Sequence, residues 1–217
     1  MKSKKTNLDF TYEQPFIEKG IYVAGVDEAG RGPVAGPVVA SAVILKTEFV
    51  NDYGITDSKK LTYQKREELY GIIKQNSVSI GISIIDNFII DEINILQSTI
   101  KAMHQAIKQL KPIPTLLFID GNYFKDVGIP FKTIVKGDSK CLSIAAASII
   151  AKVTRDKWMI EVADKLYPQY NFRQHKGYGT KAHIEAIKEH GLCEFHRKTF
   201  LKKYCKEDNN LFNDMNK

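Results

Sequence analysis

Residues 21–45 read IYVAGVDEAGRGPVAGPVVASAVIL, and this stretch decides the fold class. Its two ends, 21–28 and 38–45, are rich in β-branched and other apolar side chains, which is typical of buried strands. Between them, the glycine- and proline-rich segment AGRGPVAGP (29–37) predicts a turn. We therefore expect the core to begin with two strands joined as a β-hairpin.

Downstream of this hairpin, strands and helices alternate. Apolar periodicity and breaker residues predict strands at 78–85, 115–120 and 131–137, and helices at 62–76, about 93–110, from 139 past 155, and about 180–190. Three early strands followed by β/α alternation favour one α/β domain with a mixed sheet, in which the later strands are parallel. The C-terminal helices are expected to form a lobe of their own.

Length and composition fit one folded domain. The chain has 217 residues, of which 43% are hydrophobic and 26% charged, a balance typical of soluble globular proteins. Both ends lack an apolar pattern and are expected to fray. We therefore divide the chain into a flexible segment at 1–18, an α/β domain at 19–190, and a C-terminal extension and tail at 191–217.

The charge balance indicates a polyanionic partner. The formal net charge is +7 and the pI about 9.1, and clustered lysine and arginine bind phosphate by releasing its counterions. Nucleic acid and anionic membrane surfaces both fit this signal, and so does a merely solvated basic surface. The N-terminus is polar and the apolar runs are too short to span a bilayer, so neither export nor membrane insertion is expected.

Cysteine and histidine usage narrows the chemistry. The three cysteines form no CxxC pair and favour a reducing cytoplasm; they are Cys141, Cys193 and Cys205. The histidines between 175 and 196 lack the spacing of paired metal ligands, and His183 and His190 are expected on a helix surface. No Ser/His/Asp order or activated cysteine supports covalent nucleophilic catalysis.

Four acids stand at the ends of apolar strands. Asp27 and Glu28 end the first strand, Asp120 ends the strand at 115–120, and Asp138 follows the strand at 131–137. Like charges brought together at one sheet edge repel unless a cation compensates. Oxygen-only ligands favour Mg²⁺ or Mn²⁺ over zinc, and two such ions can promote in-line phosphodiester hydrolysis.

Each acid also has a purely structural interpretation. Asp27 and Glu28 are suited to an ordinary turn, and Asp120 before Gly121 is a common turn pair. Asp138 is suited to cap the long helix that follows it. These alternatives stay open on the residues alone.

Glycines and basic groups suggest contacts to a nucleic-acid backbone. Gly30, Arg31 and Gly32 allow close approach of a ligand to the main chain, although a tight hairpin turn explains them too. TDSKKL (56–61) presents Ser58 and Lys59 before a helix, where hydroxyl, ammonium and N–H groups converge on phosphate, or where they simply cap it. A basic track and one aromatic ring extend this surface, or form only a solvated face: Lys152, Arg155, Lys157, Arg173, Lys176, Lys181 and Tyr178.

These blocks and their order resemble the signature of the ribonuclease HII family. The resemblance covers about residues 21–182 and rests on VAGVDEAGRGPVAGPVV, TDSKKL, LLFIDG, KGDSK, SIAAASIIAKVTRD and HKGYGT. It implies a ribonuclease H-like α/β fold with a mixed sheet flanked by helices and a C-terminal helical extension. The chain lacks room for the extended N-terminal domain of the related ribonuclease HIII.

The resemblance also implies an activity. The family cuts the RNA strand of RNA/DNA hybrids and cuts 5′ of ribonucleotides embedded in duplex DNA, leaving 3′-hydroxyl and 5′-phosphate ends. It acts in ribonucleotide removal from DNA and in RNA primer removal. By motif, Asp27, Glu28, Asp120 and Asp138 match the four catalytic acids, which bind two Mg²⁺ or Mn²⁺ ions.

Substrate selection is implied as well. The turn Gly30–Gly32 matches the element that recognises the ribose 2′-hydroxyl, and Tyr178 matches the tyrosine that stacks beneath the next DNA sugar. Two other functions remain in view: a structure-specific DNA nuclease of the same superfamily, and a hybrid-binding module without catalysis. We expect a monomer, since no long exposed apolar stripe is evident, and the sequence names no protein partner.

Overall fold

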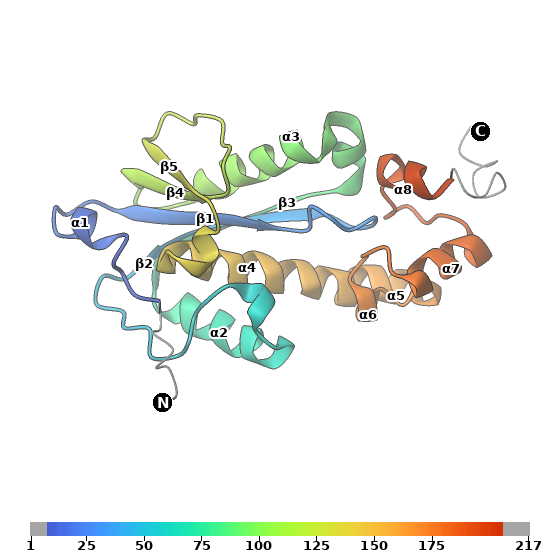
Figure 1. Ribbon diagram of the computed structural model, residues 1–217, viewed down its shortest axis with the longest axis horizontal. Helices are drawn as coiled ribbons and strands as arrows, with labels where there is room; N and C mark the ends of the chain where they lie inside the picture. The colour runs from blue at the N-terminus through green and yellow to red at the C-terminus, as the bar shows by residue number, and fades with distance from the viewer. Residues whose placement is uncertain (1–7, 206–217) are drawn as a thin grey trace.

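The computed structural model describes residues 8–205 and contains a five-stranded mixed sheet with helices on both faces (Figure 1). The strand order is β3-β2-β1-β4-β5. β1 and β2 pair antiparallel, as do β2 and β3, whereas β1, β4 and β5 run parallel. The strands are β1 (Val23–Ala29), β2 (Val38–Leu45), β3 (Ser77–Ile85), β4 (Leu116–Asp120) and β5 (Phe131–Ile134). The mixed sheet predicted from the alternating pattern is confirmed.

The helices follow the order predicted from periodicity, with several shorter additions. They are α1 (Gln14–Ile17), α2 (Tyr63–Gln75), α3 (Asn87–Ile107), α4 (Leu142–Trp158), α5 (Asp164–Leu166), α6 (Phe172–His175), α7 (Lys181–His190) and α8 (Lys198–Cys205). Short 3₁₀ helices occur at Ser58–Lys60, Gly137–Ser139 and Pro168–Tyr170, and a π-helical turn at Met159–Ala163 joins α4 to α5. Within residues 8–205, none of these helices has the length and apolar character needed to cross a bilayer.

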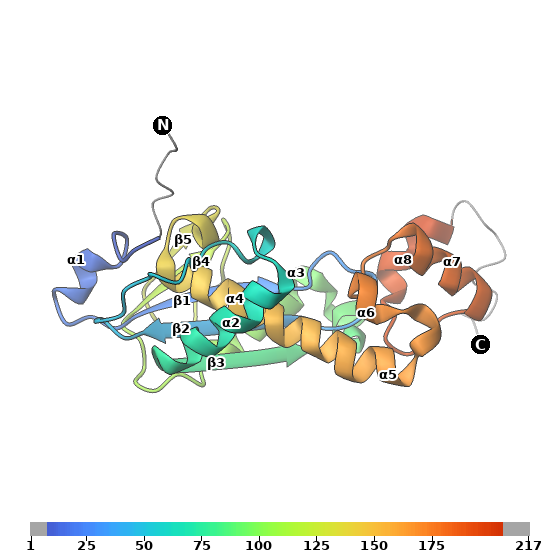
Figure 2. The same cartoon turned by 90° about the horizontal axis from the view of Figure 1, so that it is seen from below.

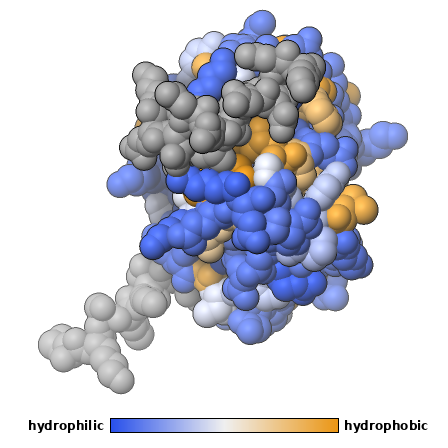
Figure 3. All heavy atoms as spheres, turned by 90° about the vertical axis from the view of Figure 1, so that its right-hand side faces the viewer, coloured by the Kyte–Doolittle hydropathy of each residue, from blue (hydrophilic) through white to orange (hydrophobic). Residues whose placement is uncertain are grey.

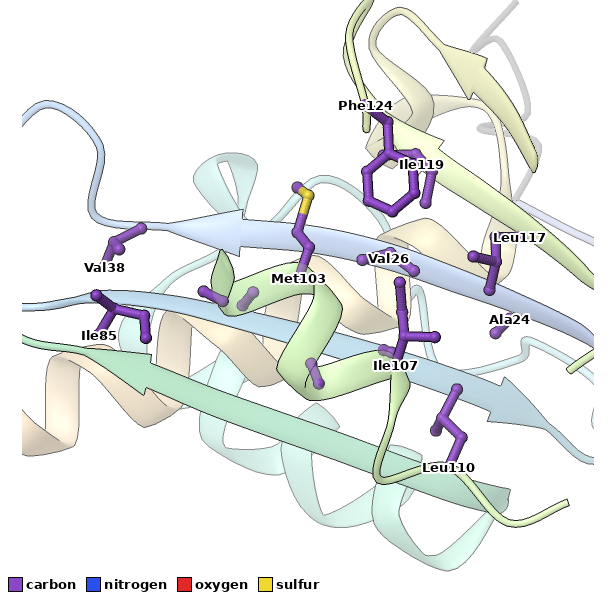
Figure 4. Packing of buried hydrophobic residues seen from close by; sticks show 14 of the residues in the cluster. Ala24, Val26, Val38, Ile85, Met103, Ile107, Leu110, Leu117, Ile119 and Phe124 are labelled. Carbon is purple, nitrogen blue, oxygen red and sulfur yellow. The ribbon is translucent and has the colours of Figure 1, made fainter. Parts of the chain in front are cut away.

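One face of the sheet is covered by α3. Met103 and Ile107 lie one helical turn apart and face Val26 of the central strand β1 and Leu117 of its neighbour β4 (Figure 4). The helix lies so close to β3 that a β-carbon at Gly81 would stand 1.9 Å from the carbonyl oxygen of Ala106. Burial of this apolar stripe stabilises the helix and fixes its position on the sheet.

The other face is covered by α4, with α2 packed against α4 on its far side (Figure 2). The first half of α4 is rich in alanine, which allows a close approach to the sheet. A β-carbon at Gly25 would stand 2.1 Å from the backbone carbon of Ser143, so only glycine fits there. This contact sets the start of α4, and the segment just before it, against the middle of β1.

The link between β1 and β2 differs from the tight hairpin turn that was one of its interpretations. Val34 donates its backbone N–H to Gly177 O at 2.8 Å, and Ala35 forms an isolated antiparallel bridge with His196. The link therefore extends to the C-terminal helices at the right of Figure 1. These helices bury an apolar cluster of their own, as a lobe predicts: Val34, Ala35, Met159, Ala163, Tyr170, Phe172, Ile187 and Leu201. The outer face of this end is largely hydrophilic (Figure 3).

Three local predictions need correction. α4 begins at Leu142, not at 139, and its N-cap position is Cys141; Asp138 lies in the preceding 3₁₀ helix and does not cap α4. α3 begins at Asn87, before the apolar repeat that predicted it, and contains a residue with positive φ, Asn94. His183 is fully buried rather than on the surface, because α7 turns it toward the lobe's core, whereas His190 is exposed as predicted.

Part of the N-terminal segment packs on the domain. Glu13 is 1% exposed, and its Oε1 accepts the backbone N–H of Ser143 at 2.8 Å and the thiol of Cys141 at 3.0 Å. Residues 1–7 of this segment lie outside the described part of the chain, and the flexibility predicted for 1–18 stays a prediction. Glu13 thus supplies the acceptor that the N-terminus of α4 lacks in its own sequence.

Replacing Glu13 with alanine is expected to lower the free energy of unfolding by about 1–2 kcal/mol, the usual effect of losing a helix cap. Glu13→Gln keeps an acceptor oxygen and should lose less. Urea unfolding of the three proteins measures this, and a Glu13→Ala midpoint equal to that of the wild type would contradict the capping role.

Candidate active site

Asp27 and Asp120 lie side by side on adjacent strands, and Glu28 follows Asp27 on β1. In the parallel pairing, Val26 lies opposite Ile119, so Asp27 and Asp120 come next on adjacent strands. Asp27 is two residues beyond Gly25 and therefore points to the same face, which is the face covered by α4. Glu28 points to the other face of β1. The carboxyl ends of adjacent parallel strands are a common ligand site in α/β proteins.

Asp138 is brought to the same place by a turn between β5 and α4. Asp120 Oδ1 accepts the backbone N–H of Gly137 at 2.7 Å. Lys136, at the start of this turn, has a φ of 56°, which directs the chain back toward the sheet. A β-carbon at Gly137 would stand 3.3 Å from Asp120 Oδ1, so glycine here lets the next residue, Asp138, approach the strand ends.

The carboxyl groups perturb one another. Burial raises the pKa of Asp27 well above its ordinary value, and the charges of Glu28, Asp120 and Asp138 add to this effect. Burial also raises the pKa of Glu28, although Arg31, whose Nη1 lies 3.5 Å from Glu28 Oε1, opposes the shift. Such mutual repulsion is typical of a site that gains stability from a bound cation.

A fifth acid, Asp57, joins this group and was not singled out from the sequence. Burial and then the charge of Asp57 raise the pKa of Asp138, to which Asp57 is also hydrogen-bonded. Asp57 Oδ1 in turn accepts the backbone N–H of Lys59 at 2.9 Å. The signal was present in TDSKKL (56–61), where the acid directly precedes the serine and lysine that were considered.

Lys59 adds a positive charge beside the acids. Desolvation lowers its pKa, but Asp138, Asp27, Asp57 and Asp120 together raise it by more, so the net shift is upward. The ammonium group is therefore charged at neutral pH and faces the acids. It offsets part of their repulsion and remains available to a phosphate.

The donor set suits a hard divalent cation. The acids provide carboxylate oxygens, which Mg²⁺ and Mn²⁺ prefer. Ser41 lies opposite Asp27 on β2 and is buried, and its hydroxyl has no hydrogen-bond partner among residues 8–205. As the side chains stand, no group of three or more His, Cys, Asp or Glu residues in the described part of the chain is arranged to hold a metal ion; the carboxylates instead bond to backbone and to each other.

The glycine-rich turn and Tyr178 lie together at the edge of this acidic group. A β-carbon at Gly32 would stand 3.8 Å from Tyr178 Cε1. Tyr178 is 46% exposed, so much of its ring is open to a ligand. Arg31 follows Glu28 on the same turn and contacts it. The structure thus places the tyrosine of KGYGT beside the turn at 30–32.

The hydroxyl of Ser58 is bonded to the long helix α4. Ser58 is 3% exposed, and its Oγ is 2.7 Å from Ser148 Oγ of α4. Its hydroxyl therefore fastens the TDSKKL segment to α4.

The predicted basic track is only partly on the surface. Arg155 is 1% exposed and bonds to backbone carbonyls, so it is wrong as a nucleic-acid contact. Lys152 lies 2.7 Å from Asp156 and 6.0 Å from the centre of the Tyr178 ring. Lys157, Arg173 and Lys181 each pair with an acid, and of the three the Lys181 side chain is the most exposed, at 91%.

Comparison with known proteins fits this geometry. Residues 24–203 match the family described as Ribonuclease HII. The chain belongs to the ribonuclease HII family.

The relatives agree in sequence and in fold. Ribonuclease HII of Chloroherpeton thalassium is 55% identical over 197 residues, which are 89% of this chain and 96% of that protein. Ribonuclease HII of Acetivibrio thermocellus is 54% identical over 194 residues, 89% of this chain and 75% of that protein. The crystal structure of ribonuclease H2 from Pyrococcus horikoshii superposes with a TM-score of 0.70 at 27% identity, covering 88% of this chain and all of that one. The fold is therefore ribonuclease H-like, and the protein is a ribonuclease H.

Proposed function

We propose that this ribonuclease HII hydrolyses the RNA strand of RNA/DNA hybrids and cuts 5′ of ribonucleotides embedded in duplex DNA, leaving 3′-hydroxyl and 5′-phosphate ends. The observation that carries the proposal is the meeting of acids from three separate segments, Asp27–Glu28, Asp120 and Asp138, at one sheet edge. The turn at 30–32 and Tyr178 lie next to them. Membership of the family supports ribonuclease H activity, and the cleavage position and the product ends are proposed in addition.

The acids would hold two Mg²⁺ or Mn²⁺ ions. When bound, such ions activate a water molecule and stabilise the leaving oxygen of the scissile phosphate. Within the fold, Asp27 is 5% exposed, and Asp120 is held in place by the N–H of Gly137. A protein of the same fold, Bst-RNase HIII, has been solved in complex with Mn²⁺; it is 20% identical and has a TM-score of 0.60.

The remaining residues would bind and orient the substrate. Lys59 would bind a phosphate next to the cleavage site, since its ammonium group faces the acids. Gly30, Arg31 and Gly32 would read the ribose 2′-hydroxyl, the group by which a protein distinguishes RNA from DNA. The half-exposed ring of Tyr178 would stack against the following deoxyribose, so the pair would select an RNA-to-DNA junction.

In the cell this activity would serve ribonucleotide removal from DNA and removal of RNA primers. Both processes act on DNA in the cytoplasm, and we propose that the protein is located there. The protein would work as a monomer, and no protein partner is proposed.

Cleavage of three matched duplexes tests the proposal: one with a single ribonucleotide, one all-DNA, and one RNA/DNA hybrid, each with and without Mg²⁺ or Mn²⁺. We expect metal-dependent cutting of the first and third, and in the first only 5′ of the ribonucleotide. Cutting of all-DNA would indicate a structure-specific DNA nuclease, and tight binding without cutting would indicate a hybrid-binding module. Either result would overturn the proposal.

A further inference from the structure

A buried arginine from the C-terminal extension lies beneath the glycine-rich turn. Arg197 is 0% exposed, and its guanidinium donates only to backbone carbonyls of the link between β1 and β2. Nε bonds to Gly36 O at 2.8 Å, Nη2 to Gly30 O at 2.8 Å, and Nη1 to Pro33 O at 2.8 Å and to Arg31 O at 3.3 Å. One side chain thus holds four carbonyl groups of one loop.

A second buried arginine completes the arrangement. Arg155 of α4 is 1% exposed and donates to Ala35 O at 3.0 Å, to Pro37 O at 2.9 Å and to Lys176 O at 2.9 Å. The last of these bonds joins the loop to the segment that carries Tyr178.

Neither arginine forms an ion pair with a carboxylate within residues 8–205. Enclosing an unpaired charge is costly unless every donor finds an acceptor. Nonpolar residues would fill the same space at a lower cost in desolvation. The charges of these two arginines and the carbonyl acceptors around them therefore indicate that the arginines hold the loop in one conformation.

The direction of the carbonyl groups fixes the direction of the N–H groups. In a trans peptide the C=O and the following N–H point to opposite sides. Because the carbonyls of Gly30 and Arg31 point inward to Arg197, the N–H groups of Arg31 and Gly32 point outward. Neither N–H makes a backbone hydrogen bond in the described part of the chain. These are the main-chain donors at the mouth of the site, next to Tyr178.

We propose that Arg197 is a positioning residue for ribose selection: by holding the loop's carbonyls inward, it keeps the N–H groups of Arg31 and Gly32 presented to the sugar. Arg155 sets the register between this turn and Tyr178. The proposal rests on the proposed function, because it concerns how the same site distinguishes ribose from deoxyribose. It assigns the C-terminal extension a part in specificity and gives Arg197 no contact with substrate.

The test is the change in selectivity when Arg197 becomes lysine. Lysine keeps the positive charge, but its single ammonium group cannot reach four carbonyls arranged around a planar fork. The quantity to measure is the ratio of the affinity for a single-ribonucleotide duplex to the affinity for an all-DNA duplex, in Ca²⁺ so that binding is separated from cleavage. We expect this ratio to fall roughly tenfold, the effect of losing one or two hydrogen bonds. Affinity for the all-DNA duplex should stay near that of the wild type.

Ile73→Ala provides a matched control for lost stability. Ile73 is fully buried in α2, away from the turn, and its truncation lowers stability without touching the loop. Selectivity unchanged in Arg197→Lys, or lost equally in Ile73→Ala, would overturn the proposal. Arg197→Met is a second variant. If it unfolds at the assay temperature, the selectivity of Arg197→Lys alone decides the test. A wild type that does not favour the ribonucleotide duplex would instead refute the proposed function itself.

Discussion

Asp27→Asn is expected to reduce cleavage of a single-ribonucleotide duplex by about a thousandfold or more, the effect of losing several kcal/mol of transition-state stabilisation. Asp27 is 5% exposed and central among the acids, since Glu28, Asp120 and Asp138 all act on its pKa. Asparagine is nearly the same size and can still accept the N–H of Glu28, which Asp27 Oδ1 accepts at 2.7 Å. The fold should therefore remain intact. Initial rates at saturating Mn²⁺ measure the loss.

The same substitution should raise the stability of the metal-free protein at pH 8. The folded-state pKa of Asp27 is raised, so between its unfolded and folded values the folded chain binds the proton more tightly. Stability is then highest at low pH and falls as the pH rises through that window. Asparagine carries no such penalty, so the variant should unfold at a higher temperature than the wild type at pH 8, with the difference vanishing near pH 4.

Two controls separate these effects. Asp126→Asn changes an acid in the loop between β4 and β5 that lies outside the acidic group, and it should alter neither rate nor pH profile. Rapid cleavage by Asp27→Asn would contradict the role of Asp27. Equal unfolding temperatures for Asp27→Asn and the wild type at every pH would contradict the repulsion described for the site.

Tyr178→Ala should lower junction cleavage by roughly five- to hundredfold, the usual effect of removing an aromatic ring that stacks on a nucleotide. Tyr178→Phe should keep most of the activity, because the proposed contact uses the ring face. The ring is 46% exposed, so the alanine variant loses little packing inside the protein. Values of kcat/KM on the single-ribonucleotide duplex measure both.

Tyr22→Ala is the matched control for this prediction. Tyr22 is also 46% exposed, but it precedes β1 and so lies at the opposite end of the strand from Asp27. Its removal should leave kcat/KM unchanged. If Tyr178→Ala and Tyr178→Phe were equally active, stacking by the ring would be ruled out.

The fold was largely predictable because its signals are local. The β-branched and apolar side chains of 21–28 and 38–45 predicted β1 and β2, and Thr62 and Thr180 mark the starts of α2 and α7 as N-caps. The start of α4 was wrong by three residues. Its cap comes from Glu13, more than a hundred residues away, and no local pattern reveals such a partner.

The site was predictable for the strand-end acids and less so elsewhere. An acid at the end of a buried strand is unusual wherever it occurs, so Asp27 and Asp120 stand out in one sequence. Asp57 does not stand out, because an acid before a serine also suits an ordinary helix cap. Asp57 does cap the 3₁₀ helix Ser58–Lys60. Arg155 was misplaced and Arg197 overlooked, since a lone arginine gives no sign that a distant loop's carbonyls will enclose it.

The central claim is that the carboxylates at the ends of β1 and β4 hold divalent ions, and titration of Mn²⁺ into the wild type and Asp120→Asn by calorimetry tests it most directly. We expect Mn²⁺ to bind the wild type with release of protons, because Asp27, Glu28 and Asp138 have raised pKa values. Affinity should rise between pH 5.5 and pH 8, and should weaken at least tenfold in Asp120→Asn. Mn²⁺ binding that is independent of pH and equal in the two proteins would contradict the account.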